Sequence, residues 1–267
     1  MDYEKALQRL IRWAQATATV RALVLTGSAA AHLVHPLSDR DLELFVTDHD
    51  GLLRDESWWT DLGEVLVVER LDNPGWHPTR LVYYAGGKLD FTIIPTTALS
   101  GRTYDRPFEV LVDKDGQAPT RAQTSPAADL PPSDEFTQSL HWAYAAALMC
   151  AKAIVRDEPW SAKIRDRDLK DELLKVIEWD HRVRYGPAID TRFLGSRMRR
   201  WMDDDVQADL QRCWARFDLD DTAAALEATV ELLARLAART GRTLGYEPFP
   251  HSRLHTEVRA ILSHTAS

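Results

Sequence analysis

Hydrophobic residues follow two different spacings along this chain, and the change between them divides it in two. A helix-like spacing at Tyr3–Ala16 comes first, and a short helix is expected again at Ala29–Val34. Between and after these helices, short runs of β-branched and aliphatic residues predict strands at Val20–Leu25, Asp39–Val46, Val65–Val68, Leu81–Tyr84, Leu89–Ile94 and Val110–Val112. Beyond residue 133 the apolar residues recur every three to four positions and predict helices alone, at Phe136–Val155, Leu169–Trp179, Met198–Trp214 and Thr222–Arg239.

The segment Gln117–Ser133 separates these two halves. It is rich in Ala, Pro, Ser and Thr, which is typical of a linker. We therefore expect an α+β protein with a mixed sheet flanked by helices in residues 1–132 and an all-helical bundle in residues 133–267. Ser133 or Asp134 is the expected N-cap of the first helix of the bundle.

The composition narrows the classes of partner. With 45% hydrophobic and 28% charged residues among 267, the chain has the balance of an ordinary globular protein. Its net charge of −8 would repel a nucleic-acid backbone, so no nucleic-acid partner is expected. No run approaches the ~18 apolar residues that a membrane span needs. Two distant cysteines suggest no disulfide framework, so we expect a cytoplasmic protein. A monomer is the favoured oligomeric state.

Asp39 and Asp41 are the first candidates for chemistry. Side chains two positions apart on a strand share a face, so these two carboxylates should project together. Paired carboxylates repel each other unless a cation lies between them, and hard oxygen ligands are what Mg²⁺ prefers. An Asp-x-Asp pattern also arises by chance at a solvated strand end, so the pair needs support from elsewhere in the chain.

Two further features give that support. Gly27 and Ser28 follow a strand and open a helix, where backbone N–H groups can hold phosphate oxygens, although Gly-Ser also occurs in ordinary turns. Asp90 interrupts an apolar strand, and burying a carboxylate there is costly without a partner. That partner is either an arginine or a metal ion shared with Asp39 and Asp41, and we favour the metal.

The order of these motifs resembles that of the polymerase-β-like nucleotidyltransferase superfamily. The order is a strand, a Gly-Ser turn, a helix, an Asp-x-Asp strand and a strand with a third Asp. More narrowly, the chain resembles the aminoglycoside 6-adenylyltransferases, the streptomycin-resistance enzymes. The resemblance covers nearly the whole chain and rests on Leu25–Ser28, Asp39–Val46, Leu62–Leu66, Gly87–Pro95, Val110–Gly116, Ala151–Ala153 and Leu244–Pro248. It implies transfer of AMP from ATP to a hydroxyl of a cationic aminoglycoside, with two Mg²⁺ ions and release of pyrophosphate.

The resemblance also implies roles for individual residues. Asp39, Asp41 and Asp90 would bind metal, and Asp90 is a candidate general base. Nucleotide contacts are expected from Gly27, Ser28, Arg40 and Lys152. By their residue types, Trp179 and Asp180 are candidates for the aminoglycoside groove, since an aromatic ring beside a carboxylate suits an aminocyclitol, but packing is the better explanation for either residue alone. Three charged residues are expected on a solvated face or at the rim of the site: Glu43, Lys88 and Arg156.

Two departures from the family keep other functions open. Ala29 stands where the family usually has an arginine, and Arg40 where it tends to have an aromatic residue. The same chemistry on another small-molecule or protein acceptor is therefore a second hypothesis. A non-catalytic nucleotide-binding module is a third, although three converging carboxylates without a metal would only repel one another.

Overall fold

In a computed structural model the chain forms two compact units, Met1–Pro126 and Ala127–Ser267. The described residues are 1–30, 35, 37–104, 107–119, 130–186, 189–191 and 194–264, with the side chain of Ser28 left out. The greater part of the expected linker and residues 31–34 of the short expected helix lie outside this set.

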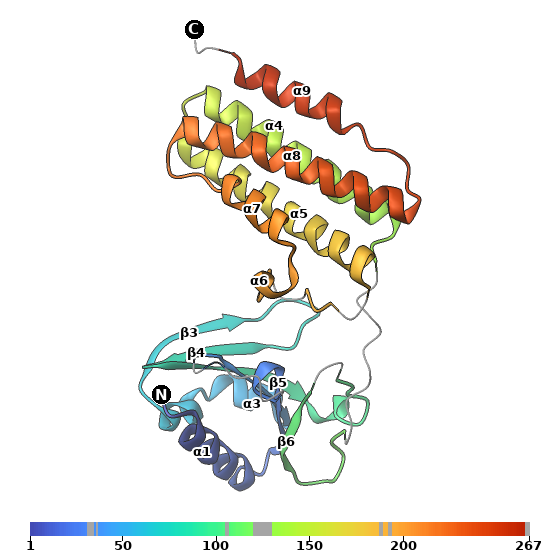
Figure 1. The fold of residues 1–267 in the computed structure, drawn as a ribbon. Coiled ribbons are helices and arrows are strands. Elements are labelled where there is room, and N and C mark those ends of the chain that lie inside the picture. The colour runs from blue at the N-terminus through green and yellow to red at the C-terminus, as the bar shows by residue number, and fades with distance from the viewer. Residues whose placement is uncertain are drawn as a thin grey trace. The chain divides into compact units, whose positions relative to one another are not determined.

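The first unit is a six-stranded sheet with short helices around it (Figure 1). Its strands are β1 (Val20–Thr26), β2 (Arg40–Val46), β3 (Val65–Leu71), β4 (Thr79–Tyr84), β5 (Gly87–Pro95) and β6 (Glu109–Asp113). Its helices are α1 (Tyr3–Ala16), α2 (Gly27–Ala30), α3 (His49–Arg54), η1 (Ser57–Leu62) and η2 (Thr96–Ala98).

The sheet has the order β3-β4-β5-β2-β1-β6. Only the central pair β2 and β5 is parallel among these neighbours; the others are antiparallel. The sheet is therefore mixed, as the sequence predicts. Because a parallel pair aligns both strands in one direction, the N-terminal ends of β2 and β5 meet at the same edge of the sheet.

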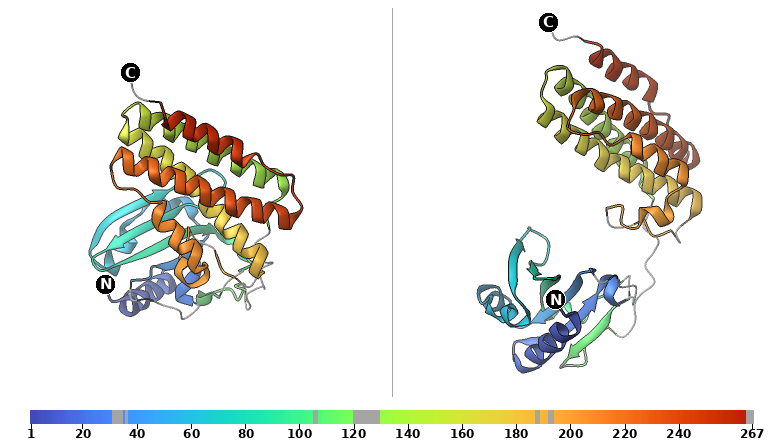
Figure 2. Two further views of the ribbon diagram at one scale, coloured as in Figure 1. Left: turned by 45° about the horizontal axis from the view of Figure 1, so that its top comes forward. Right: turned by 60° about the vertical axis from the view of Figure 1, so that its left-hand side comes forward.

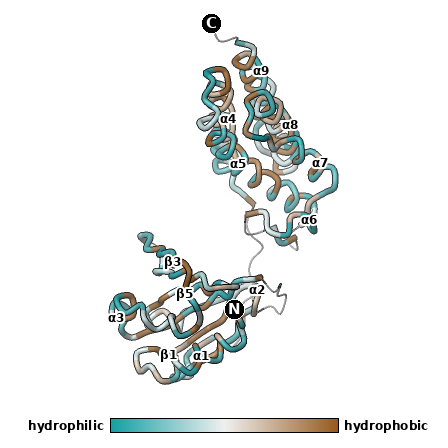
Figure 3. The backbone as a smooth tube through the Cα atoms, turned by 90° about the vertical axis from the view of Figure 1, so that its left-hand side faces the viewer, coloured by the Kyte–Doolittle hydropathy of each residue, from teal (hydrophilic) through white to brown (hydrophobic). Residues whose placement is uncertain are grey.

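Apolar residues cover both faces of this sheet. One face packs against α1 and η1 through Leu10, Trp58 and Phe91, all with at most 6% of their surface exposed. The other face carries a smaller cluster that includes Val24, Phe45 and Tyr104. In Figure 3 the brown, hydrophobic stretches run along the strands of this sheet. Strands buried on both faces explain the nearly continuous apolar sequence of β1.

The second unit contains only helices among its described residues. They are α4 (Ser133–Val155), α5 (Pro159–Tyr185), α6 (Met198–Trp201), α7 (Asp204–Arg212), α8 (Leu219–Leu244) and α9 (His251–Leu262). The long helices α4, α5 and α8 lie side by side with α9 against α4 and α8, as both views of Figure 2 show. Their shared core includes Leu140, Leu173 and Leu233. The predicted α+β fold, with a sheet unit followed by a helical unit, is confirmed.

Several predicted boundaries are wrong. Helix α5 is much longer than Leu169–Trp179, and Met198–Trp214 breaks into α6 and α7 near Asp203. Neither Ser133 nor Asp134 caps α4, because Pro132 occupies the cap position and no side chain bonds there. Helices α3 and α9 and the turn η1 were not predicted.

Candidate active site

Asp41 and Asp90 face each other across the parallel pair at the centre of the sheet. Their Cα atoms are register partners on β2 and β5. Register partners on neighbouring strands project to the same face, so the two carboxylates lie beside each other. Asp39 comes one residue before β2 and two before Asp41. The sheet thus brings together three aspartates that are separated by up to 51 positions in the sequence.

A lysine lies between two of these aspartates. The Nζ atom of Lys88 is 3.0 Å from Asp39 Oδ2 and 3.0 Å from Asp90 Oδ2. Only 18% of the lysine side chain is exposed, so the expectation of a solvated face is wrong for Lys88. Burial opposes its charge, but the hydrogen bonds to Asp90 and Asp39 outweigh burial and raise the pKa of Lys88. The signal was its position two residues before Asp90, which puts both on one face of β5.

Asp90 lies in an environment that disfavours its charge. Burial raises the pKa of Asp90 to about 6, with Lys88 opposing the rise and the charges of Asp41 and Asp39 adding to it. Its Oδ1 atom is buried and has no hydrogen-bond partner among the described residues. A buried carboxylate oxygen without a partner is costly, and one more cation or donor would satisfy it.

Gly27 lies directly against Asp41. Its φ of +72° belongs to the left-handed region, and a Cβ atom built there would be 2.1 Å from Asp41 Oδ2. A side chain at this position would therefore both strain the backbone and displace the carboxylate. Glycine is required at position 27 because the backbone there approaches the Asp41 carboxylate closely. Ser28 follows in α2, and a phosphate contact by Gly27 or Ser28 stays a prediction.

Glu43 continues the same strand face inward from Asp41. It is 8% exposed and accepts hydrogen bonds from Arg102 Nε at 3.1 Å and from Tyr104 Oη at 2.6 Å. The second Arg102 nitrogen, Nη2, bonds its other oxygen. The expectation that Glu43 lies at the rim is wrong, because an arginine far along the sequence neutralises it inside the sheet. Sequence spacing carries no signal for Arg102.

The structure does not bring Arg40 to these carboxylates. Arg40 alternates with Asp41 on β2, and its guanidinium lies 4.0 Å from the ring centre of Tyr3 on α1. Its Nη1 donates to the backbone oxygen of Ser38 at 2.6 Å. Lys152 is exposed on α4 of the other unit, so a contact from Lys152 to nucleotide stays a prediction.

Trp179 and Asp180 are both buried in the helical unit. Trp179 is 6% exposed and packs against Phe136, with ring centres 5.7 Å apart. Asp180 is completely buried, and both of its oxygens accept hydrogen bonds at 2.7 Å from Arg239. Arg184 Nε adds a third bond to Asp180 at 3.0 Å. Packing and internal ion pairing account for these two residues.

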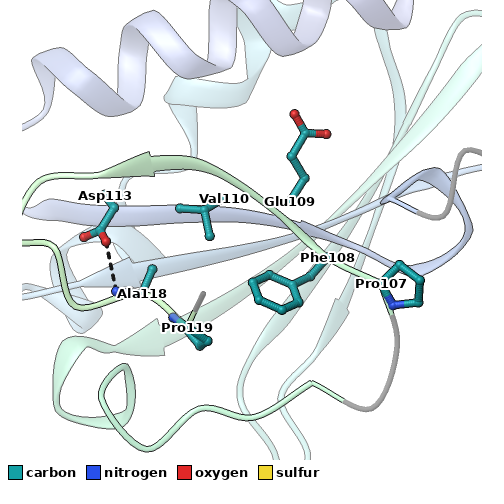
Figure 4. Close-up of a pocket in the computed structure, with 7 residues that line it drawn as sticks. All are labelled: Pro107, Phe108, Glu109, Val110, Asp113, Ala118 and Pro119. Atoms are coloured by element: carbon teal, nitrogen blue, oxygen red, sulfur yellow. Dashed lines mark hydrogen bonds between the residues drawn. The ribbon is translucent and has the colours of Figure 1, made fainter. Parts of the chain in front are cut away.

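The described pockets lie elsewhere. A pocket of about 540 Å³ borders the edge strand β6, where Phe108, Val110 and Pro119 line it and Asp113 accepts a hydrogen bond from the Ala118 amide (Figure 4). None of the three aspartates lines this pocket, because β1 separates β6 from β2. The convergence of charge and the raised pKa of Asp90 identify the three aspartates as a candidate site.

A second acidic group lies between two helices of the other unit. Single ligand atoms of Glu227, Glu231 and His255 lie within 4.8 Å of one another. Arg259 already donates to both glutamates, at 3.0 and 3.1 Å. This ion pairing accounts for the group.

Within the described residues, no helix is long and apolar enough to cross a membrane.

A mixed sheet that sets Asp90 beside Asp41, next to a glycine turn between strand and helix, is the arrangement expected of a nucleotidyltransferase, and the family match shows that class. Within that class, the sequence profile of the family described as streptomycin adenylyltransferase matches residues 1–264. The chain belongs to this family. The resemblance stated from its motifs is thereby confirmed.

Individual relatives are distant. An aminoglycoside 6-adenylyltransferase of Campylobacter jejuni is 23% identical over 184 residues, which cover 64% of this chain and 64% of that protein. This match spans slightly less than two thirds of the relative's length. The corresponding Staphylococcus aureus protein is 26% identical over 196 residues, covering 67% and 70% of the two chains. The crystal structure of an aminoglycoside 6-adenyltransferase from Bacillus subtilis matches with a TM-score of 0.50 and 15% identity, covering 99% of this chain and 100% of that chain, and supports the fold.

Proposed function

We propose that this protein transfers AMP from ATP to a hydroxyl group of a streptomycin-like aminoglycoside and releases pyrophosphate, in a reaction that requires Mg²⁺. The observation that carries the proposal is the register of the parallel pair. It sets Asp90 directly beside Asp41, and Lys88 contacts both Asp90 and Asp39, so the three carboxylates lie close together. Family membership and relatives described as aminoglycoside 6-adenylyltransferases support the choice of reaction and acceptor.

The residues present fit a divalent metal ion. Asp90 Oδ1 is buried without a hydrogen-bond partner among the described residues, and Gly27 leaves free the space that a Cβ atom would take beside Asp41. All three aspartates offer hard oxygen ligands of the kind that Mg²⁺ prefers. When bound, Mg²⁺ would neutralise triphosphate charge and stabilise the attacking and leaving oxygens.

The chain's own groups divide the remaining work. Asp90 is the proposed general base that accepts the proton of the acceptor hydroxyl as its oxygen attacks the α-phosphorus. Burial raises the pKa of Asp90 to about 6, above that of an ordinary aspartate. The bond from the α-phosphorus to the bridging oxygen breaks, and pyrophosphate leaves. The backbone at Gly27 and Ser28 is proposed to hold the phosphates.

Two aspartate substitutions test this mechanism. Asp39→Asn and Asp90→Asn should each lower kcat/KM for AMP transfer by at least roughly a hundredfold, because each removes a charged ligand or base. Pyrophosphate release with ATP, Mg²⁺ and streptomycin measures the reaction, and mass spectrometry of streptomycin identifies the added AMP. Asp50→Asn is the matched control, since Asp50 has 81% of its side chain exposed on the same unit. Turnover that survives either site substitution would refute the mechanism.

The surroundings of Ala29 favour a second candidate, the same transfer to a different acceptor. Ala29 and Ala30 both pack into the hydrophobic core beside the sheet, with at most 9% exposure. Neither offers a polar group to phosphate or acceptor. A panel of aminoglycosides and other hydroxyl compounds with labelled ATP decides between the acceptors, and labelling of only a non-aminoglycoside would replace the first candidate.

A further inference from the structure

Lys88 occupies the position in which a metal ion would be expected to contact two of the aspartates. Its ammonium nitrogen is 3.0 Å from Asp39 Oδ2 and 3.0 Å from Asp90 Oδ2. Asp39 is 43% exposed and Asp90 16% exposed, so the lysine bridges an open and a buried carboxylate. The three aspartates carry a formal charge of −3, which Lys88 reduces to −2.

An ammonium and a divalent cation cannot share these oxygens without strong mutual repulsion. A lysine can yield, because its charge sits at the end of a flexible four-carbon chain. The ring of Tyr83, whose centre is 5.3 Å from Nζ, adds a weak cation–π attraction that an exchange of partners at the carboxylates need not break. Entry of a divalent cation would therefore require Lys88 to move off Asp39 and Asp90.

We propose that Lys88 is an internal cation that competes with divalent metal for Asp39 and Asp90 and thereby sets the metal affinity of the site. The inference rests on the proposed function, because it needs the three aspartates to bind metal. Without nucleotide, metal has to displace the lysine from both carboxylates. With nucleotide present, the displaced ammonium gains the phosphates as new partners, so metal and nucleotide strengthen each other's binding.

The first test measures binding of Mn²⁺ alone, from the electron paramagnetic resonance signal of free Mn²⁺, in the full chain. Lys88→Met should bind Mn²⁺ at least about tenfold more tightly than the wild type, because the competing charge is gone. Lys88→Arg, which keeps the charge, should stay within about threefold of the wild type. Lys5→Met is the matched control: Lys5 also pairs with an aspartate, Asp2, at 3.1 Å, but lies elsewhere on the same unit.

Asp90→Asn separates failure of this inference from failure of the proposed function. It should weaken Mn²⁺ binding at least tenfold. If Asp90→Asn weakens binding but Lys88→Met leaves it unchanged or weaker, the competition by Lys88 is refuted and the metal site stands. If Asp90→Asn binds Mn²⁺ as the wild type does, the proposed metal site is refuted together with the inference.

The second test needs no substitution and so does not depend on the folding of Lys88→Met. The measurement is the extent to which an amine-reactive reagent modifies Lys88, read by peptide mass spectrometry. This modification should increase several-fold when Mg²⁺ is added at saturation without nucleotide. Lys5 should react equally with and without Mg²⁺. Unchanged reactivity of Lys88 at saturating Mg²⁺ would overturn the proposal.

Discussion

Substitution of Gly27 by alanine probes the contact between the glycine turn and Asp41. At a φ of +72° an alanine costs ~1–2 kcal/mol of backbone strain. The new Cβ would also be 2.1 Å from Asp41 Oδ2, whereas Cβ contacts under 3.0 Å are essentially never seen. The carboxylate must therefore retreat by about 1 Å, a displacement that can cost ~100-fold in rate at a reacting centre.

Gly75 supplies the matched control for this substitution. Its φ is +83°, and a Cβ atom there would meet nothing within 4 Å. Gly75→Ala therefore isolates the backbone strain, and the difference between the two variants isolates the displacement of Asp41. We expect urea denaturation to show a loss of ~1–2 kcal/mol in the free energy of unfolding for Gly75→Ala and at least as much for Gly27→Ala.

Activity separates the two variants. Only Gly27→Ala should lose kcat/KM for AMP transfer, by at least roughly a hundredfold, with weaker Mn²⁺ binding to match. If Gly27→Ala keeps activity within about threefold of Gly75→Ala, then Asp41 does not need its present position, and the reasoning from close approach fails.

Two further predictions concern charges away from the reacting centre. Glu43→Gln should destabilise the sheet unit by ~1–3 kcal/mol in urea denaturation, because Arg102 keeps a partly buried charge without its carboxylate. Tyr104→Phe, which removes only a hydrogen bond to Glu43, should cost ~1 kcal/mol. Equal effects of the two substitutions would contradict the ion-pair argument. Burial lowers the pKa of His251 from its ordinary 6.5 to about 4, so the unfolded chain binds a proton that the folded chain refuses. The contribution of His251 to the free energy of unfolding is complete above pH 6.5 and is lost as the pH falls through about 4, by at most ~3 kcal/mol. His251→Gln should make the free energy of unfolding less dependent on pH, as measured by denaturation curves at pH 7 and pH 4.5.

The hydrophobic pattern predicts the strands well because burial on one or both faces dictates it directly. It fails at both ends of α5 because buried charged residues lie there. Asp166, before the predicted start, pairs with Lys170 inside the unit, and Asp180, after the predicted end, pairs with Arg239. These buried polar residues break the apolar spacing that the prediction depends on. In α9 only Val258 is fully buried, so the pattern is too sparse to predict a helix.

The three aspartates can be found from the sequence, but their partners cannot. Asp39 and Asp41 are found from their Asp-x-Asp spacing, and Asp90 is found because it interrupts an apolar strand. The pairing of β2 with β5 joins segments about 50 residues apart, and only this pairing sets Asp41 beside Asp90. Ion pairs such as Glu43 with Arg102 depend on the same long-range geometry. Lys88 is the exception, because its spacing from Asp90 was visible in the sequence and was outweighed by the general tendency of lysines to be solvated.

The position of Lys88 also answers the objection that three carboxylates would repel one another in a chain without metal. Repulsion among them would oppose folding of β2 against β5, because that pairing brings Asp41 and Asp90 together. A lysine on the same strand as Asp90 relieves the repulsion wherever the sheet forms, since no second molecule is needed. The same contact then weakens the site for metal alone. Folding of the sheet thus requires a cation beside these carboxylates, whereas binding of metal together with nucleotide requires that this cation leave them. A lysine whose ammonium can move satisfies both requirements.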